Sequence, residues 1–259
     1  MGSGEILSLL REVVNRGWIL DDCRGMAYYQ ISLKDNVEIT KKTRREIMEY
    51  EIIMVTPLMQ NCTLLWDAES KKGATVDPGG DSEVILRSID LAGVELEKVL
   101  LTHAHIDHVG AAGALAEKFG IPIEGPHLGD QFLVDGLEQQ GMAFGVELER
   151  VFSPDRWLEQ GDAVAFGGIE LEVRHCPGHT PGHVIFYHAG DRLAITGDVL
   201  FSGSIGRTDF PGGDYDTLLN SIREQLWPLG EDVAFISGHG PMSTFGEERR
   251  TNPFVGDGR

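Results

Sequence analysis

The chain has few cysteines and no long apolar run. Its three cysteines among 259 residues, Cys23, Cys62 and Cys176, show no regular spacing. That pattern argues against a disulfide framework and favours a reducing compartment. No segment approaches the roughly 20 apolar residues of a membrane helix, and the first residues lack the features of a secretion signal. We therefore expect a cytoplasmic protein that does not span a membrane.

Basic residues are also scarce. The chain has 22 Lys and Arg against 41 Asp and Glu, which gives a formal net charge of −19 at pH 7. This negative charge disfavours binding to nucleic acid or to an anionic membrane, because both attract basic proteins. With 41% hydrophobic residues the chain can build a substantial core. These properties indicate an acidic enzyme that acts on a small molecule, and they leave its oligomeric state open.

The charge is distributed unevenly along the chain. Residues 1–47 contain eight basic and seven acidic residues, so residues 48–259 contain 14 basic and 34 acidic ones. We therefore predict an N-terminal extension over residues 1–47, which packs or forms an interface, and one domain over residues 48–259. The first four residues of the extension resemble a cloning scar.

From residue 51 the pattern alternates between strands and helices. Apolar runs predict strands near residues 52–55, 63–66, 74–76, 99–101, 163–173, 183–187, 192–196 and 233–236. Helical spacing of apolar residues predicts a helix that begins at Asp81 and stops at Gly93, and others near residues 109–119, 131–140 and 218–228. By itself this pattern predicts a mixed α/β domain.

A histidine-rich motif follows the run at residues 99–101. Within six residues it contains His103, His105, Asp107 and His108. A strand that leads into such a loop directs several side chains at one point. Neutral imidazole and carboxylate are ligands for zinc, iron or manganese. The motif therefore predicts a metal site at the end of this strand.

Three further candidate ligands lie downstream. His179 stands between a Cys-Pro-Gly and a Thr-Pro-Gly turn, Asp198 follows Thr196-Gly197, and His239 lies between Gly238 and Gly240. Each follows an apolar run or a Gly/Pro turn, which places it on a loop at a strand end. Alone, each would be an ordinary loop residue; together with the histidine-rich motif they indicate one centre. The remaining histidines of this region, and Cys176, are expected to be structural.

In this order the motifs resemble those of the metallo-β-lactamase superfamily, from about residue 48 to the C-terminus. The resemblance implies a four-layer αβ/βα sandwich and two adjacent metal sites. The first site would take His103, His105 and His179, and the second Asp107, His108 and His239. Asp198 would bridge the two metals, a metal-bound hydroxide would be the nucleophile, and Asp107 would help to orient it. Asp77 would brace the metal loop through hydrogen bonds.

Shorter segments resemble one branch of that superfamily, the short bacterial, YcbL-type branch of the type II glyoxalases. They are residues 48–53, 60–62, 197–198, 206–210, 238–241 and 248–254. This implies a hydroxyacylglutathione hydrolase that cleaves S-lactoylglutathione with two divalent ions, zinc first, with iron or manganese as alternatives. The chain departs from full-length type II glyoxalases because it ends about 20 residues after His239, without their helical glutathione-binding domain. The candidate substrate contacts are therefore Arg207, which could instead pair with Asp209, and Arg249.

Two alternatives remain open. A persulfide dioxygenase of the same superfamily shares the segment at residues 206–210 but uses one iron; Gly238-His239-Gly240 favours two metals instead. A hydrolase of another small ester, thioester or lactone would share the whole metal site.

Overall fold

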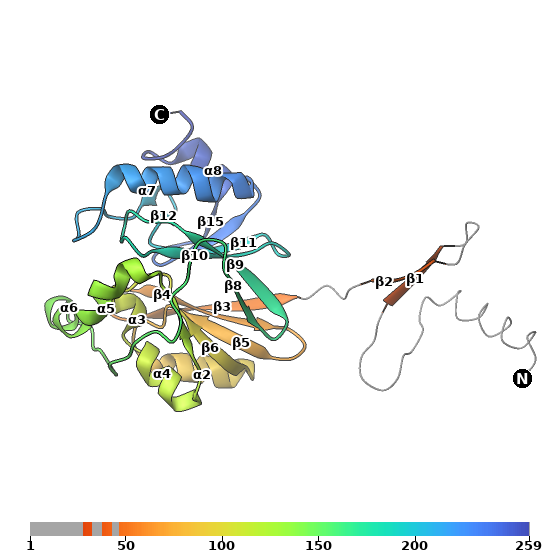
Figure 1. The fold of residues 1–259 in the computed structure, drawn as a ribbon, viewed down its shortest axis with the longest axis horizontal. Coiled ribbons are helices and arrows are strands. Elements are labelled where there is room, and N and C mark those ends of the chain that lie inside the picture. Colours follow the sequence, from red (N-terminus) through yellow and green to blue (C-terminus); the bar gives the residue numbers. More distant parts are fainter. Residues whose placement is uncertain (1–27, 33–37, 43–46, 259) are drawn as a thin grey trace, which may run out of the picture. The chain divides into compact units, whose positions relative to one another are not determined.

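The computed structural model describes residues 28–32, 38–42 and 47–258 (Figure 1). The contacts divide the chain into two units, Met1–Glu46 and Ile47–Arg259. In the first unit the described residues form an antiparallel pair, β1 (Tyr28–Ser32) and β2 (Glu38–Lys42). The remainder of the predicted extension, including Cys23, lies outside the described residues.

The second unit contains two main sheets. The first has five strands in the order β3-β4-β5-β6-β7. They are β3 (Met48–Val55), β4 (Gln60–Asp67), β5 (Lys72–Val76), β6 (Glu95–Leu100) and β7 (Ile123–Glu124). The second has six strands in the order β15-β14-β11-β10-β9-β8. They are β8 (Ala163–Phe166), β9 (Ile169–His175), β10 (Val184–His188), β11 (Leu193–Gly197), β14 (Ala234–Ser237) and β15 (Ser243–Thr244). A short hairpin of β12 (Leu200–Phe201) and β13 (Ser204–Ile205) forms a separate two-stranded sheet.

Helices cover the outer face of each sheet. On the first sheet, Ile85 and Ile89 of α2 (Ser82–Ala92) and Leu115 of α4 (Ala112–Phe119) belong to one buried cluster with strand residues such as Leu64. A second buried apolar cluster lies on the outer face of the second sheet. It is covered by α7 (Tyr215–Ser221), by the helical turns Ile222–Leu226 and Trp227–Leu229, and by α8 (Phe245–Thr251). Figure 1 shows these helices on opposite sides of the two sheets.

A third apolar cluster lies between the two sheets. It brings Leu65, Val76 and Leu100 of the first sheet against Phe166 and Phe186 of the second. Every residue of β4 is buried because helices cover one of its faces and the second sheet covers the other. The exposed edge strand β8 alternates between exposed and buried residues instead. The order helix, sheet, sheet, helix confirms the expected four-layer α/β sandwich.

Local sequence signals predict both ends of α2, but the expected N-cap hydrogen bond is absent. Gly93 ends the helix with a φ of 65°, the left-handed conformation that favours glycine. Asp81 stands at the N-cap as expected, but its side chain makes no capping hydrogen bond. Its carboxylate accepts the backbone N–H of Thr56 at 2.7 Å instead, so a tertiary contact takes the group that would have capped the helix.

Strand direction determines where the functional loops meet. β5 pairs in parallel with β6, and β11 pairs in parallel with β14, so each pair ends at one edge of its sheet. Asp77 follows β5 and the histidine-rich motif follows β6. Asp198 and His239 follow β11 and β14. His179 lies in the turn between β9 and β10. No helix within the described ranges is long and apolar enough to cross a membrane.

We propose that residues 48–259 fold as a domain without the extension. A chain that begins at Met48 should unfold cooperatively, with a midpoint within a few degrees of the full-length protein, because the described residues from Met48 onward form three apolar clusters among themselves. Thermal unfolding followed by circular dichroism measures this. Aggregation, or loss of the cooperative transition, would show that the extension is needed for the fold.

Candidate metal centre

Three imidazoles form the first ligand group: His103, His105 and His179. Each offers one ring nitrogen, and these atoms lie within 4.8 Å of one another. His105 Nδ1 is 3.2 Å from His103 Nε2 and 3.0 Å from His179 Nε2. Ligand atoms about 2.0–2.1 Å from a tetrahedral ion lie roughly 3.3 Å apart, so this spacing fits one ion bound by all three rings.

The second ligand group consists of Asp107, His108 and His239, whose ligand atoms also lie within 4.8 Å of one another. Asp107 Oδ2 is 3.2 Å from His239 Nε2 and 3.8 Å from His108 Nε2. Asp107 and His108 belong to the short helix α3 (Ile106–Val109), which places both on the turn that follows the histidines of the first group. His239 arrives from the second sheet, so the group joins the two halves of the sandwich.

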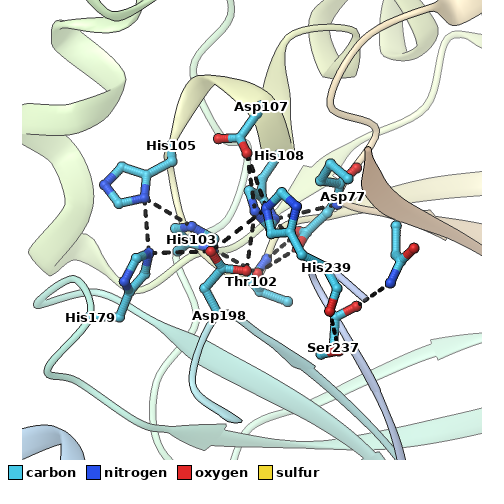
Figure 2. A network of polar contacts seen from close by, with 12 residues as sticks. Asp77, Thr102, His103, His105, Asp107, His108, His179, Asp198, Ser237 and His239 are labelled. Carbon is cyan, nitrogen blue, oxygen red and sulfur yellow. Dashed lines mark hydrogen bonds and ion pairs between the residues drawn. The ribbon is translucent and has the colours of Figure 1, made fainter. Parts of the chain in front are cut away.

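Asp198 lies between the two groups, as Figure 2 shows. Its Oδ2 is 3.6 Å from His179 Nε2 and 3.8 Å from His239 Nε2, and its Oδ1 is 3.4 Å from His108 Nε2. The carboxylate therefore faces one histidine of the first group and two of the second. His108 Nε2 and Asp198 Oδ1 are both buried without a hydrogen-bond partner. Two buried polar atoms that point at the same space would be costly alone and suit a shared cation.

The outer nitrogens of the histidines are fixed by acceptors. His179 Nδ1 donates to the carbonyl of Arg207 at 2.7 Å, and His239 Nδ1 donates to the carbonyl of Leu58 at 3.2 Å. These bonds place the proton on Nδ1 and leave the lone pair of Nε2 directed at the centre. Sequence reasoning missed both carbonyl acceptors, because a backbone carbonyl leaves no mark in the sequence.

Asp77 fixes the loop between β6 and α3. Its carboxylate accepts the backbone N–H of Thr102 at 2.7 Å, the hydroxyl of Thr102 at 2.5 Å and His108 Nδ1 at 2.9 Å. The Thr102 hydroxyl in turn lies 3.0 Å from His103 Nδ1. Asp77 thus orients one histidine directly and another through Thr102, which is the geometry expected of its bracing role.

Two glycines permit the close packing of these loops. A Cβ at Gly79 would lie 1.6 Å from the carbonyl oxygen of Asp107. A Cβ at Gly238 would lie 2.1 Å from Asp198 Oδ1 and 2.5 Å from His108 Cε1. Any side chain at either position would displace a member of the second ligand group.

A cleft of about 890 Å³ opens above the centre. His105, Asp107, His179, Asp198 and His239 line it, together with a mostly apolar wall that includes Leu58, Phe144, Phe201, Phe210 and Pro241. Phe210 packs against His105 with ring centroids 5.1 Å apart. The centre is thus reachable by a small molecule whose uncharged part would contact the wall.

The two candidate substrate arginines occupy different places. Arg207 lines the cleft, where its guanidinium is 2.8–2.9 Å from the carboxylate of Asp209 and 4.4 Å from the ring centroid of Phe210. The pairing with Asp209 considered from the sequence is therefore present. Arg249, on α8, pairs with Asp257 and Glu231 and is not among the residues that line the cleft. The structure thus brings only Arg207 to the centre.

Comparison with known proteins agrees with this geometry. Residues 55–239 match the model of the metallo-β-lactamase superfamily. The chain belongs to this superfamily. Its members include metal-dependent hydrolases, and the protein is a metal-dependent hydrolase with donors suited to divalent ions.

Individual members of the superfamily cover most of the chain. The hydroxyacylglutathione hydrolase GloC of Haemophilus influenzae is 48% identical over 209 residues, which are 80% of this chain and 98% of that protein. The structure of BLEG-1, described as a B3 metallo-β-lactamase, is 34% identical with a TM-score of 0.73, over 80% of this chain and 99% of that one. TTHA1623, described in a di-iron-bound form, is 38% identical with a TM-score of 0.72, over 79% and 100%.

Burial and charge divide the histidines into two classes. Burial, followed by the nearby His179, lowers the pKa of His105 to about 3, and burial also lowers the pKa of His103 and His179. For His108 burial opposes the charged form, but the carboxylates of Asp198 and Asp107 outweigh it and raise its pKa well above the ordinary value. Near pH 7 the first group therefore presents neutral donors, whereas metal-free His108 is protonated.

Metal binding at pH 7 should consequently release at least one proton per chain, because an ion can reach His108 Nε2 only after the proton leaves, and the raised pKa of His239 adds to the release. The apparent affinity should fall at least about tenfold for each pH unit below the raised pKa of His108. Calorimetric titration of the metal-free protein with zinc, in buffers of different ionisation enthalpy, counts the protons. A binding heat that is the same in every buffer would contradict the assignment of His108 as a ligand.

Proposed function

We propose that the protein is a thioester hydrolase with two metal ions, a hydroxyacylglutathione hydrolase that converts S-lactoylglutathione to lactate and glutathione. The observation that supports this best is the arrangement of two ligand groups around one shared carboxylate, Asp198. The 48% identity to GloC supports the choice of a glutathione thioester.

The match to GloC is compatible with this substrate. GloC aligns over 98% of its own length with this chain, so nearly the whole of a protein named for the same activity is matched here. The substrate would then be recognised by the cleft itself.

The chain's own residues would divide the work as follows. His103, His105 and His179 would hold one ion, Asp107, His108 and His239 would hold the other, and Asp198 would be shared between them. When bound, the two ions supply a water of lowered pKa and polarise the thioester carbonyl. Asp107 lies on the cleft side of the second group and orients the attacking water. Water adds its oxygen to the acyl carbon, the carbon–sulfur bond breaks, and the thiolate takes up a proton.

Arg207 would contact the glutathione part. It is the arginine that lines the cleft, and its guanidinium lies at the rim, beside Phe210. A substrate carboxylate would compete with Asp209 for the same fork of donors. We propose zinc as the metal; the same ligands suit iron, and the di-iron form of TTHA1623 keeps that choice open.

The first experiment measures metal content and S-lactoylglutathione hydrolysis on one sample. We expect about two ions per chain and release of thiol with turnover that requires metal. A β-lactam and a lactone serve as comparison substrates, and faster hydrolysis of either would replace the thioester as the substrate class. A single iron, no hydrolysis and oxygen uptake with glutathione persulfide would instead establish the dioxygenase.

Two substitutions test the division of ligands. Asp198→Ala should remove both ions and reduce kcat by at least about 10³-fold. Each site loses a ligand, and the negative charge that Asp198 places between the two ions is lost. His239→Ala should leave the first ion bound and empty mainly the second site. Metal content by mass spectrometry, with turnover on the same samples, measures both. Two ions retained by Asp198→Ala would contradict the bridging role, and a fully active one-metal His239→Ala would contradict the need for two metals.

A further inference from the structure

Asp130 is a fully buried carboxylate outside both ligand groups. It ends the single turn Leu128–Asp130 and stands at the N-cap of α5 (Gln131–Asp135), with 0% of its surface exposed. An aspartate at this position would be expected to cap the helix. Its side chain makes no capping hydrogen bond, so the carboxylate is used elsewhere.

The carboxylate of Asp130 joins two loops that are far apart in the sequence. Its Oδ2 accepts the backbone N–H of Ala104 at 3.1 Å and the hydroxyl of Thr180 at 2.9 Å. Its Oδ1 accepts the backbone N–H of Gly182 at 2.6 Å. Ala104 lies between His103 and His105, and Thr180 follows His179. One side chain therefore bonds to a residue next to each of the three imidazoles of the first ligand group.

The loops approach so closely that the contact depends on a glycine. A Cβ at Gly182 would lie 2.4 Å from the backbone nitrogen of Asp130 and 2.7 Å from its Cγ. The carbonyl of Gly182 also accepts the backbone N–H of His127. The side chain of Gln140 also supports the histidine-rich loop, through Ile106 and Ala104, and bonds to the carbonyl of Leu133. Unlike Asp130, it makes no bond to the loop that carries His179 within the described part of the chain.

Burial of this carboxylate is costly and is not offset by an ion pair in the described part of the chain. Burial raises the pKa of Asp130 to about 6, against three hydrogen bonds that lower it. A buried carboxylate is unfavourable unless its hydrogen bonds stabilise the structure around it, which an apolar side chain at this position would not do.

We propose that Asp130 is a positioning residue for the first metal site: it sets the distance between His179 and the pair His103 and His105. The proposal rests on the ligand assignment under the proposed function but not on the substrate. The carboxylate is required because all its partners are donors. An amide at this position would turn its NH₂ toward the N–H of either Ala104 or Gly182 in both of its orientations, which would push one loop away.

The test is the metal affinity of Asp130→Asn, measured on the metal-loaded protein by titration with a chelator. One of the two ions should leave at a chelator concentration about 10- to 100-fold lower than in the wild type, while the other leaves at the wild-type concentration. The matched control is Asp67→Asn, another buried carboxylate that accepts a backbone N–H, from Ser70, at the β4–β5 turn. The control should release both ions as the wild type does.

Two further measurements separate positioning from general stability. The visible spectrum of the cobalt(II)-loaded protein should change in Asp130→Asn and stay unchanged in Asp67→Asn, because it reports ligand geometry. If Asp130→Asn does not fold, the same titration of Thr180→Val tests the proposal. It removes one donor to Asp130 and leaves the carboxylate in place, and it should shift the release of the same ion in the same direction by a smaller factor.

The inference is overturned if Asp130→Asn, or Thr180→Val in its place, releases both ions as the wild type does. It is also overturned if Asp130→Asn and Asp67→Asn lower the chelator concentration for ion release to the same extent. A wild-type protein that binds two ions but leaves S-lactoylglutathione intact would refute the proposed substrate and leave this inference standing.

Discussion

The structure depends on holding five imidazoles and two carboxylates against one another inside the protein. Charged and polar groups at this density are unfavourable unless they are bonded to one another or to a cation. His108 shows both requirements: Asp77 holds one ring nitrogen, and the other nitrogen points with Asp198 at a space where neither has a hydrogen-bond partner. The remaining features of the fold serve to bring these groups together and keep them there.

Rigid elements surround the centre, and the ligands themselves lie on the loops between them. The inter-sheet core fixes the two sheets against each other, so the loop after β6 and the loops after β11 and β14 cannot drift apart. Around the ligands lies a second set of contacts from Asp77, Asp130, Gln140 and backbone carbonyls. Each of these orients a ligand or the peptide beside it, which reduces the entropy that metal binding would otherwise have to overcome.

The electrostatics of the centre match its proposed chemistry. The chain is strongly acidic, yet the first ligand group has three neutral imidazoles held by burial, and the carboxylates are concentrated on the second group and at Asp198. Two divalent cations would more than offset the two negative charges of Asp107 and Asp198. The wall of the cleft above is mostly apolar and would contact the uncharged part of the substrate, whereas Arg207, paired with Asp209, offers a guanidinium to its carboxylates.

The sequence alone was sufficient to predict which residues could be ligands and that the fold is of the mixed α/β class. The close spacing of His103, His105, Asp107 and His108 after an apolar run is a local signal, and so are the apolar periods of the strands and the stop at Gly93. Resemblance supplied the layer order and the pairing of ligands into groups, which spacing alone would not give, because His179, Asp198 and His239 are far away in the chain.

The residues that support the ligands could be identified only from the packed fold. Asp81 and Asp130 both stand at helix starts, where aspartate commonly caps the helix, and both carboxylates bond to distant loops instead. Arg207 and Arg249 are equally basic in sequence, but only one faces the cleft. The physical reason is the same in each case: a side chain's partner is set by which loops the two sheets bring within about 3 Å, and that proximity is a property of the packed sandwich.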